Sequence, residues 1–134
     1  VPYDVKINEN AARTLEYASI KVNKCKFGQY GVDKQYRQYT CAMIICDYTN
    51  KSDKEQSLAS VIQMQAYQNG KELNSPEYYG SFNQIKHFKD DAIPAGESTT
   101  SGFCFVPENS NDPVTVKITD FHGAELTEIE LVNE

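Results

Sequence analysis

Four cysteines, Cys25, Cys41, Cys46 and Cys104, are the residues of this chain with the most reactive side chains. No two of them are separated by only two residues, which is the spacing of zinc ribbons and of thioredoxin-type redox motifs. Neither of those sites is therefore predicted. The chemistry that remains is disulfide formation, and four cysteines allow three full pairings among which spacing alone does not choose.

Strand register narrows the choice of cysteine pair. Residues 18–27 and 39–48 contain alternating apolar and polar side chains, which predicts a hairpin that turns at Asp33. In this register Cys25 lies opposite Cys41, and both side chains point away from the core. A slip by one residue would turn the apolar side chains to the wrong face. The inward-facing pairs of the same register are Val22 with Ile44 and Ile20 with Cys46.

Two interpretations of the cysteines stay open. In the first, one disulfide forms among Cys25, Cys41 and Cys104, with Cys25 and Cys41 as the candidate pair. Cys46 then packs in the core as a small apolar side chain. In the second, all four thiols are unpaired. A metal centre on the outward-facing sulfurs is not expected, because no histidine is placed to complete it. We therefore predict neither a metal nor a cofactor.

Histidine and carboxylate residues offer no catalytic arrangement in the sequence. His87 and His122 are the two histidines, and no Gly-x-Ser-x-Gly or comparable nucleophile motif accompanies them. Glu128 and Glu130 share one face of a predicted strand, where charge protects an edge from aggregation. Residues 109–112 place oxygen ligands at alternating positions, as calcium loops do, but the missing glycine and distal glutamate favour a polar turn. We predict that the protein is not an enzyme.

Length and charge exclude several classes of partner. The chain has 134 residues, which is the size of one domain, and we expect a single domain over 1–134. Its net charge is −6, so it lacks the basic face that phosphate binding requires. Neither nucleic acid nor an anionic membrane surface is an expected partner. Apolar runs such as 42–46 are far shorter than the ~18–20 residues of a transmembrane helix, so no membrane span is predicted.

Alternating apolar and polar residues recur along the chain, whereas helical periodicity is nearly absent. Turn residues separate the alternating segments at the spacing typical of β-sandwiches. We therefore predict an all-β fold, a two-sheet antiparallel immunoglobulin-like sandwich with one short helix near 77–84. A small β-barrel is the alternative. Strands are expected at 3–7, 18–27, 39–48, 58–67, 71–73, 98–106, 114–119 and 127–131.

The parity of this alternation also predicts which side chains fill the core. Between two of the strands, Asn69 and Gly70 predict the tight turn of a hairpin, because both residues tolerate a positive φ. The predicted core residues are Ile20, Val22, Ile44, Cys46, Tyr48, Phe103, Phe105, Val116 and Ile118.

Four segments resemble a known family in their order and spacing. They read MIICDYTNKS at 43–52, AYQNGKEL at 66–73, IPAGES at 93–98 and DPVTV at 112–116. Together they are similar to the immunoglobulin-like domains of unknown function found in secreted lipoproteins of Gram-positive gut bacteria, over about residues 15–132. The resemblance implies a sandwich fold, export, and a lipid anchor on a cysteine that is lost with the leader peptide. It implies no catalytic residues.

A candidate binding site lies where the family resemblance is weakest, at 74–92. Tyr78, Tyr79 and Phe82 in this segment offer rigid aromatic contact area of the kind found in binding loops. In the competing interpretation, Tyr79 or Phe82 closes the open end of the sandwich. A second aromatic group, Tyr30, Tyr36 and Tyr39, flanks the turn near Asp33.

The sequence thus predicts an exported or cell-surface-tethered immunoglobulin-like binding or structural module without catalytic activity. Its partner would be an unidentified protein or small ligand, contacted through loops and one sheet face. The alternative is a small-molecule or glycan-binding domain with a pocket near Tyr78–Phe82. An enclosed pocket with convergent polar groups would favour that alternative.

Overall fold

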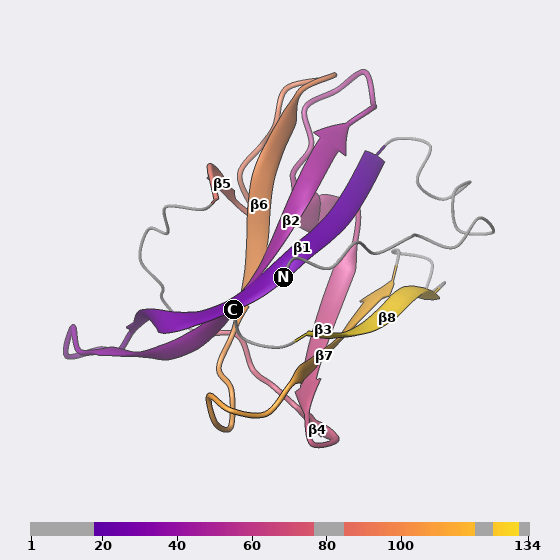
Figure 1. The fold of residues 1–134 in the computed structure, drawn as a ribbon. Coiled ribbons are helices and arrows are strands. Elements are labelled where there is room, and N and C mark those ends of the chain that lie inside the picture. The colour runs from indigo at the N-terminus through magenta and orange to yellow at the C-terminus, as the bar shows by residue number, and fades with distance from the viewer. Residues whose placement is uncertain (1–17, 77–84, 120–124, 132–134) are drawn as a thin grey trace.

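The computed structural model describes residues 18–76, 85–119 and 125–131. In this part of the chain, eight strands form two four-stranded sheets (Figure 1). Sheet 1 consists, in spatial order, of β1 (Ala18–Val32), β2 (Gln38–Asn50), β6 (Ser98–Phe105) and β5 (His87–Phe88). Sheet 2 consists of β4 (Lys71–Glu72), β3 (Gln63–Gln68), β7 (Val114–Thr119) and β8 (Glu125–Leu131).

The strand order is that of an immunoglobulin domain. Such domains place strands A, B, E and D in one sheet and C, F and G in the other. We name β4 as C′ and the other seven strands A to G in chain order. Sheet 1 then contains A, B, E and D, and sheet 2 contains C′, C, F and G. The pairings are antiparallel except for the short contact between β5 and β6, which is parallel. The predicted two-sheet sandwich is confirmed, and the alternative of a small barrel is not adopted.

Two of the expected elements, the strand at 3–7 and the short helix near 77–84, lie outside the described residues. The strand expected at 58–67 is shorter than predicted. Its first residues form a 3-10 turn, η2 (Leu58–Ser60), and β3 begins only at Gln63.

The predicted core is confirmed at every position. All nine side chains are buried and belong to one cluster between the two sheets. This main core also contains apolar residues from the connecting segments, among them Leu58, Ile62 and Ile93. Burial of this apolar surface is the dominant stabilising contribution in a domain of this size.

A second apolar cluster covers the opposite face of β2. Cys41, Met43 and Ile45 point away from the main core, and they are nevertheless buried together with Ile85 and Cys104. We call these five residues the outer cluster; Tyr39, Phe88 and Val106 pack against it while partly exposed. The sequence placed Cys41 and Cys104 correctly on the outward face but did not predict that this face is buried.

The predicted pairing of Cys25 with Cys41 is wrong. The turn between β1 and β2 centres on Gln35 rather than on Asp33, and the register then shifts by one residue at each of two irregularities in β1, between Gly28 and Gly31 and between Val22 and Lys24. Val22 consequently pairs with Cys46 rather than with Ile44. The extra residue at the second irregularity, Asn23, reverses the parity of the strand residues from Lys24 to Gly28. As a result, Cys25 pairs with Ile44 and lies in the main core. All four cysteines are buried and unbridged.

The turn at Asn69 and Gly70 is confirmed. The two residues join β3 to β4 with φ angles of 54° and 81°, which are those of a type I′ turn. Beyond the turn, the backbone N–H of Leu73 donates to the carbonyl of Ala66 at 2.8 Å, and the Leu73 side chain is buried in the main core.

Replacing Gly70 tests the turn directly. A Cβ atom at this position would meet no atom within 4 Å, so any cost must come from the backbone. We expect Gly70→Val to lower the free energy of unfolding by about 1–3 kcal/mol, because a β-branched residue is strained at positive φ. Gly70→Asn should cost much less, since asparagine tolerates this conformation. Urea unfolding of both variants measures the difference, and equal stability of the two would contradict the turn assignment.

Candidate functional site

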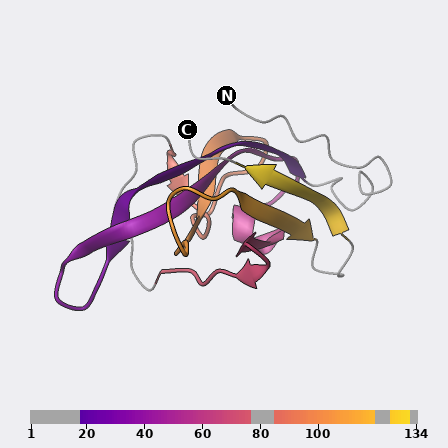
Figure 2. The same ribbon diagram turned by 60° about the horizontal axis from the view of Figure 1, so that its bottom comes forward.

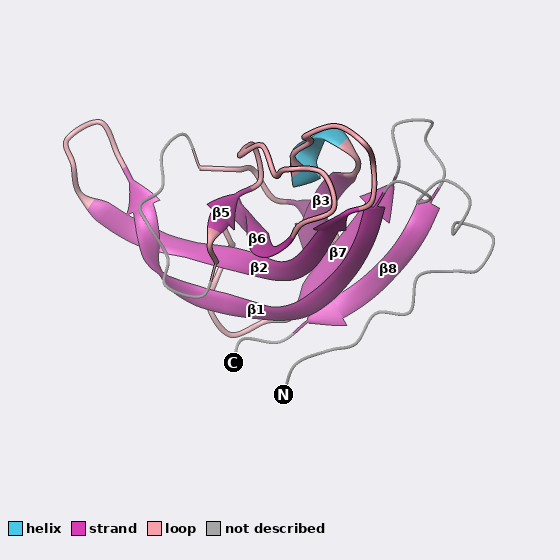
Figure 3. Cartoon of the chain, turned by 90° about the horizontal axis from the view of Figure 1, so that it is seen from above, coloured by secondary structure: helices cyan, strands magenta, loops and turns pink. Residues whose placement is uncertain are grey.

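The hairpin of β1 and β2 extends beyond the sandwich as an arm. β6 pairs with β2 only over residues 42–49, whereas β1 and β2 continue to pair with each other as far as Val32 and Gln38. Figures 1 and 2 show this arm projecting past the ends of β6 and of sheet 2, and Figure 3 shows it curving away from them. The tip of the arm is residues 33–37, none of which belongs to either apolar cluster.

Within the tip, residues 34–36 form a three-residue hairpin loop that Asp33 and Arg37 close. The N–H of Asp33 donates to the carbonyl of Arg37 at 2.9 Å, and the N–H of Tyr36 donates to the carbonyl of Asp33 at 3.0 Å. This is a type I turn followed by a residue in the left-handed region, a common way to join two antiparallel strands. That left-handed residue is Tyr36, with φ at 62°.

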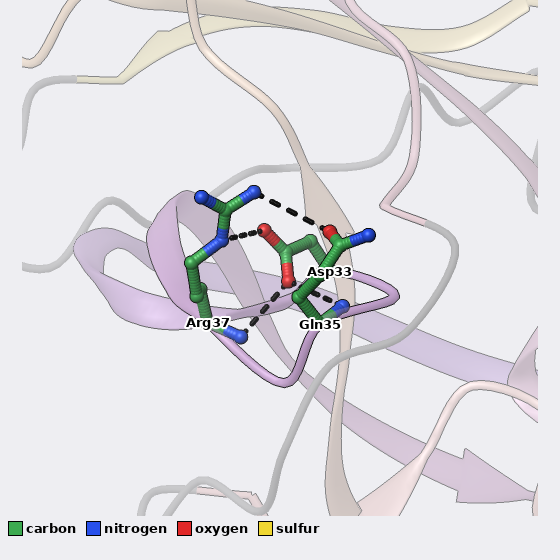
Figure 4. A network of polar contacts seen from close by, with 3 residues as sticks. All are labelled: Asp33, Gln35 and Arg37. Carbon is green, nitrogen blue, oxygen red and sulfur yellow. Dashed lines mark hydrogen bonds and ion pairs between the residues drawn. The ribbon is translucent and has the colours of Figure 1, made fainter.

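The carboxylate of Asp33 organises the loop (Figure 4). Its Oδ1 accepts the N–H groups of Gln35 and Arg37, each at 2.9 Å, while its Oδ2 accepts the guanidinium Nε of Arg37 at 2.9 Å. A second guanidinium nitrogen of Arg37 donates to Oε1 of Gln35 at 3.3 Å. The hydrogen bond from the Arg37 backbone is the main cause that holds the pKa of Asp33 below its usual range.

Tyr36 combines strain with exposure. Among the side chains that the structure describes, it is the large apolar one left exposed, at 88%. A bulky residue in the left-handed region is an outlier that costs about 1–3 kcal/mol, and glycine or asparagine ordinarily takes this position. Because its side chain is exposed, Tyr36 contributes little to packing. The hydrogen bonds that Asp33 accepts from Gln35 and Arg37 hold the loop in this conformation.

The residues proposed from the sequence as a binding site, Tyr78, Tyr79 and Phe82, lie outside the described residues. Tyr36 was named only as one of three aromatic residues near the turn. One signal in the sequence could have singled it out: the turn from Asp33 to Arg37 contains no glycine or asparagine for the left-handed position. Tyr39, another member of that aromatic group, is half-buried against the outer cluster.

The calcium-like segment is a polar turn, as the sequence favoured. Oδ1 of Asn109 accepts the backbone N–H groups of Asn111 and Asp112, and Oδ2 of Asp112 accepts the side-chain amides of Asn69 and Asn109. The bond from Asn69 is the main cause that lowers the pKa of Asp112. These oxygens serve the turn itself. Within the described residues, no group of three or more His, Cys, Asp or Glu could hold a metal ion.

A buried glutamine attaches this turn to the β3–β4 hairpin. Nε2 of Gln68 donates to the carbonyls of Asn109 and Asp112, and its Oε1 accepts the N–H groups of Glu108 and Asn109. An ion pair at 2.8 Å between Lys71 and Glu108 lies beside it. These contacts give the segment a structural role.

His87 is hydrogen-bonded rather than free. Its Nδ1 lies 2.7 Å from Oγ1 of Thr99, a buried residue of the neighbouring strand β6. This bond fastens the short strand β5 to the edge of sheet 1. His122 lies outside the described residues.

Acid titration tests the role of Asp33 at the tip. Because folding lowers its pKa, the carboxylate stabilises the turn above the ordinary aspartate pKa of about 4, and this contribution is lost as the pH falls through the lowered value in the folded state. We expect the amide proton shifts of Gln35 and Arg37 in NMR spectra to move with a midpoint below that of a free aspartate. In Asp33→Asn these shifts should not titrate. A midpoint at the ordinary value would contradict the network.

Comparison with known proteins agrees with the fold. No curated protein matches the sequence. A solved structure with a similar arrangement is that of an uncharacterized beta-sandwich protein from Clostridium difficile 630, with a TM-score of 0.56 and 15% sequence identity, covering 97% of this chain and 90% of that chain. In the described residues, no helix has the length and apolar character needed to cross a membrane. A family model matches residues 4–120, and the chain therefore belongs to the family described as "Domain of unknown function (DUF5067)".

Proposed function

We propose that this protein is a non-catalytic binding module, exported or tethered to the cell surface, that contacts its partner through the tip of the β1–β2 arm. The observation that carries the proposal is Tyr36, an exposed aromatic residue held in a strained conformation at the tip of a projecting hairpin. Strain of this kind gathers at functional sites, where it is retained because the residue does something other than pack.

The chemistry of tyrosine suits this role. The ring offers a large, rigid contact surface with few rotatable bonds, and the hydroxyl adds one directed hydrogen bond. The hydrogen bonds that the carboxylate of Asp33 accepts from Gln35 and Arg37 organise the loop before a partner arrives. Such preorganisation reduces the entropy lost on binding and so favours affinity.

Export and surface tethering rest on a different line of support. The four segments at 43–52, 66–73, 93–98 and 112–116 resemble domains of secreted lipoproteins of Gram-positive gut bacteria. The non-catalytic assignment is supported by the engagement of His87 with Thr99 and by the absence of a nucleophile motif in the sequence. Loops on a rigid sandwich are also where binding function is ordinarily found.

Substitution of Tyr36 separates function from stability. Glycine or asparagine relieves the backbone strain, so we expect Tyr36→Asn and Tyr36→Gly to leave the free energy of unfolding unchanged or to raise it by up to about 1 kcal/mol. Chemical unfolding measures this. A loss of more than about 1 kcal/mol in both variants would show that Tyr36 is a structural residue, and would contradict the proposal.

Binding is measured on the same variants. Three immobilised proteins are compared: the wild-type domain, Tyr36→Asn, and the control Gln65→Asn, whose substitution lies on the exposed face of β3. Each is incubated with extracellular and cell-surface fractions of the organism that produces the protein. We expect one component to be retained by the wild type and by Gln65→Asn but lost by Tyr36→Asn. Equal retention by all three would place the binding surface elsewhere on the domain.

A further inference from the structure

Two of the four cysteines are brought together on the outer face of sheet 1. Cys104 of β6 pairs with Met43 of β2, so Cys41 lies on the same face, one step along the diagonal of the antiparallel ladder. Both thiols belong to the outer cluster and are 0% and 2% exposed. Diagonal neighbours on one face are close enough for their side chains to interact.

The two thiols affect each other's ionisation. Hydrogen bonding with Cys104 is the main cause that lowers the pKa of Cys41, and hydrogen bonding with Cys41 is the main cause that raises the pKa of Cys104. The N–H of Gly31 in β1 adds a further hydrogen bond to Cys41. A Cβ atom at Gly31 would lie 2.5 Å from the ring of Tyr39 and 2.8 Å from Sγ of Cys41, so the ring and the sulfur together fill the space that this glycine leaves. The cysteine that more readily forms a thiolate is thus held beside its neighbour.

The other two cysteines lie in a different environment. Cys25 and Cys46 are in the main core, on the opposite face of the sheet. Burial raises the pKa of each thiol to about 12. Hydrogen bonding with another cysteine is not among the causes of either shift. The thiolate is the reactive form of cysteine, so these two are expected to be inert.

We propose that Cys41 and Cys104 form a modification site, a dithiol that closes to a disulfide when it meets a disulfide-bearing oxidant. Because Cys41 is 0% exposed, the side chains of the outer cluster must first open enough to admit the oxidant. The thiolate of Cys41 then attacks one sulfur of the oxidant, forming a mixed disulfide and releasing the first oxidant thiolate. Cys104 then loses its proton and attacks Sγ of Cys41, forming the protein disulfide and releasing the second thiolate. The two protein thiols are oxidised, and the oxidant disulfide is reduced to two thiols.

The position of the pair gives the bond two consequences. It would tie β2 to β6 at the base of the arm, since Cys41 lies just outside the stretch of β2 that pairs with β6. A diagonal pair starts with its Cα atoms about 7–8 Å apart, whereas disulfides need about 4.4–6.8 Å, so the strands must approach each other. We therefore expect a strained and readily reduced bond rather than a permanent one.

Oxidation of the folded chain tests this proposal. The wild type is incubated with oxidised glutathione at mildly alkaline pH, the remaining thiols are alkylated after unfolding, and the intact mass and the proteolytic peptides are measured. We expect the number of alkylated thiols to fall from the four of the reduced protein to two, with one peptide pair linking Cys41 to Cys104. Mild dithiol reductant should restore all four.

Variants provide the matched control. Cys25→Ala should still form the bond, whereas Cys104→Ala should give only a glutathione adduct on Cys41, and circular dichroism establishes that each is folded. Four free thiols in the treated wild type would overturn the proposal. So would a bridge that involves Cys25 or Cys46, or a stable glutathione adduct on Cys41 with Cys104 present. The wild-type peptide map gives the answer even where a variant does not fold.

Discussion

Burial of β2 on both faces is the constraint on which the rest of the structure depends. An antiparallel sheet commonly keeps one face in water, so its strands alternate apolar and polar residues. β2 instead has an unbroken buried run from Cys41 to Cys46. Ala42, Ile44 and Cys46 face the main core, while the alternate residues Cys41, Met43 and Ile45 belong to the outer cluster. Each outward side chain of this run therefore needs cover, which Ile85 supplies together with the partly exposed Tyr39, Phe88 and Val106.

This double burial fixes β2 firmly and leaves the arm supported at its base. β1 and β2 continue past the end of β6 from a base in which β2 is buried in both clusters and β1 is buried in the main core. At the tip, packing no longer contributes, and order depends on the polar bonds of Asp33. The arm thus offers an exposed tyrosine on a rigid support, which is the arrangement that a binding loop requires.

Much of this fold could be predicted from the sequence because successive side chains of a strand point to opposite faces, so that every second residue is buried. In β2, β6 and β7, alternate residues must face the same core, so the inward positions follow from the pattern alone. The turn at Asn69 and Gly70 was predictable for a local reason, since few other residues tolerate two successive positive φ angles. These features depend on neighbours along the chain.

The features that could not be predicted depend on contacts between distant segments. The bulge at Asn23 reverses the parity of β1, and no local signal marks it, so Cys25 was placed on the wrong face. The cover that Ile85 provides for the outer cluster comes from a segment with no clear alternation. The strained conformation of Tyr36 follows from the register of the whole hairpin, which places the left-handed position on that residue.

The two methionines of the chain allow the double burial of β2 to be tested with one chemistry. Met43 lies in the outer cluster at 0% exposure, and Met64 lies in the main core at 9%. The free energy of unfolding of Met43→Ala and Met64→Ala, measured in urea, compares the two faces. If the outer cluster is a second closed core, Met43→Ala should lower the free energy of unfolding by about 2–5 kcal/mol, at least as much as Met64→Ala does. A change within about 0.5 kcal/mol for Met43→Ala, as at an exposed site, would contradict it.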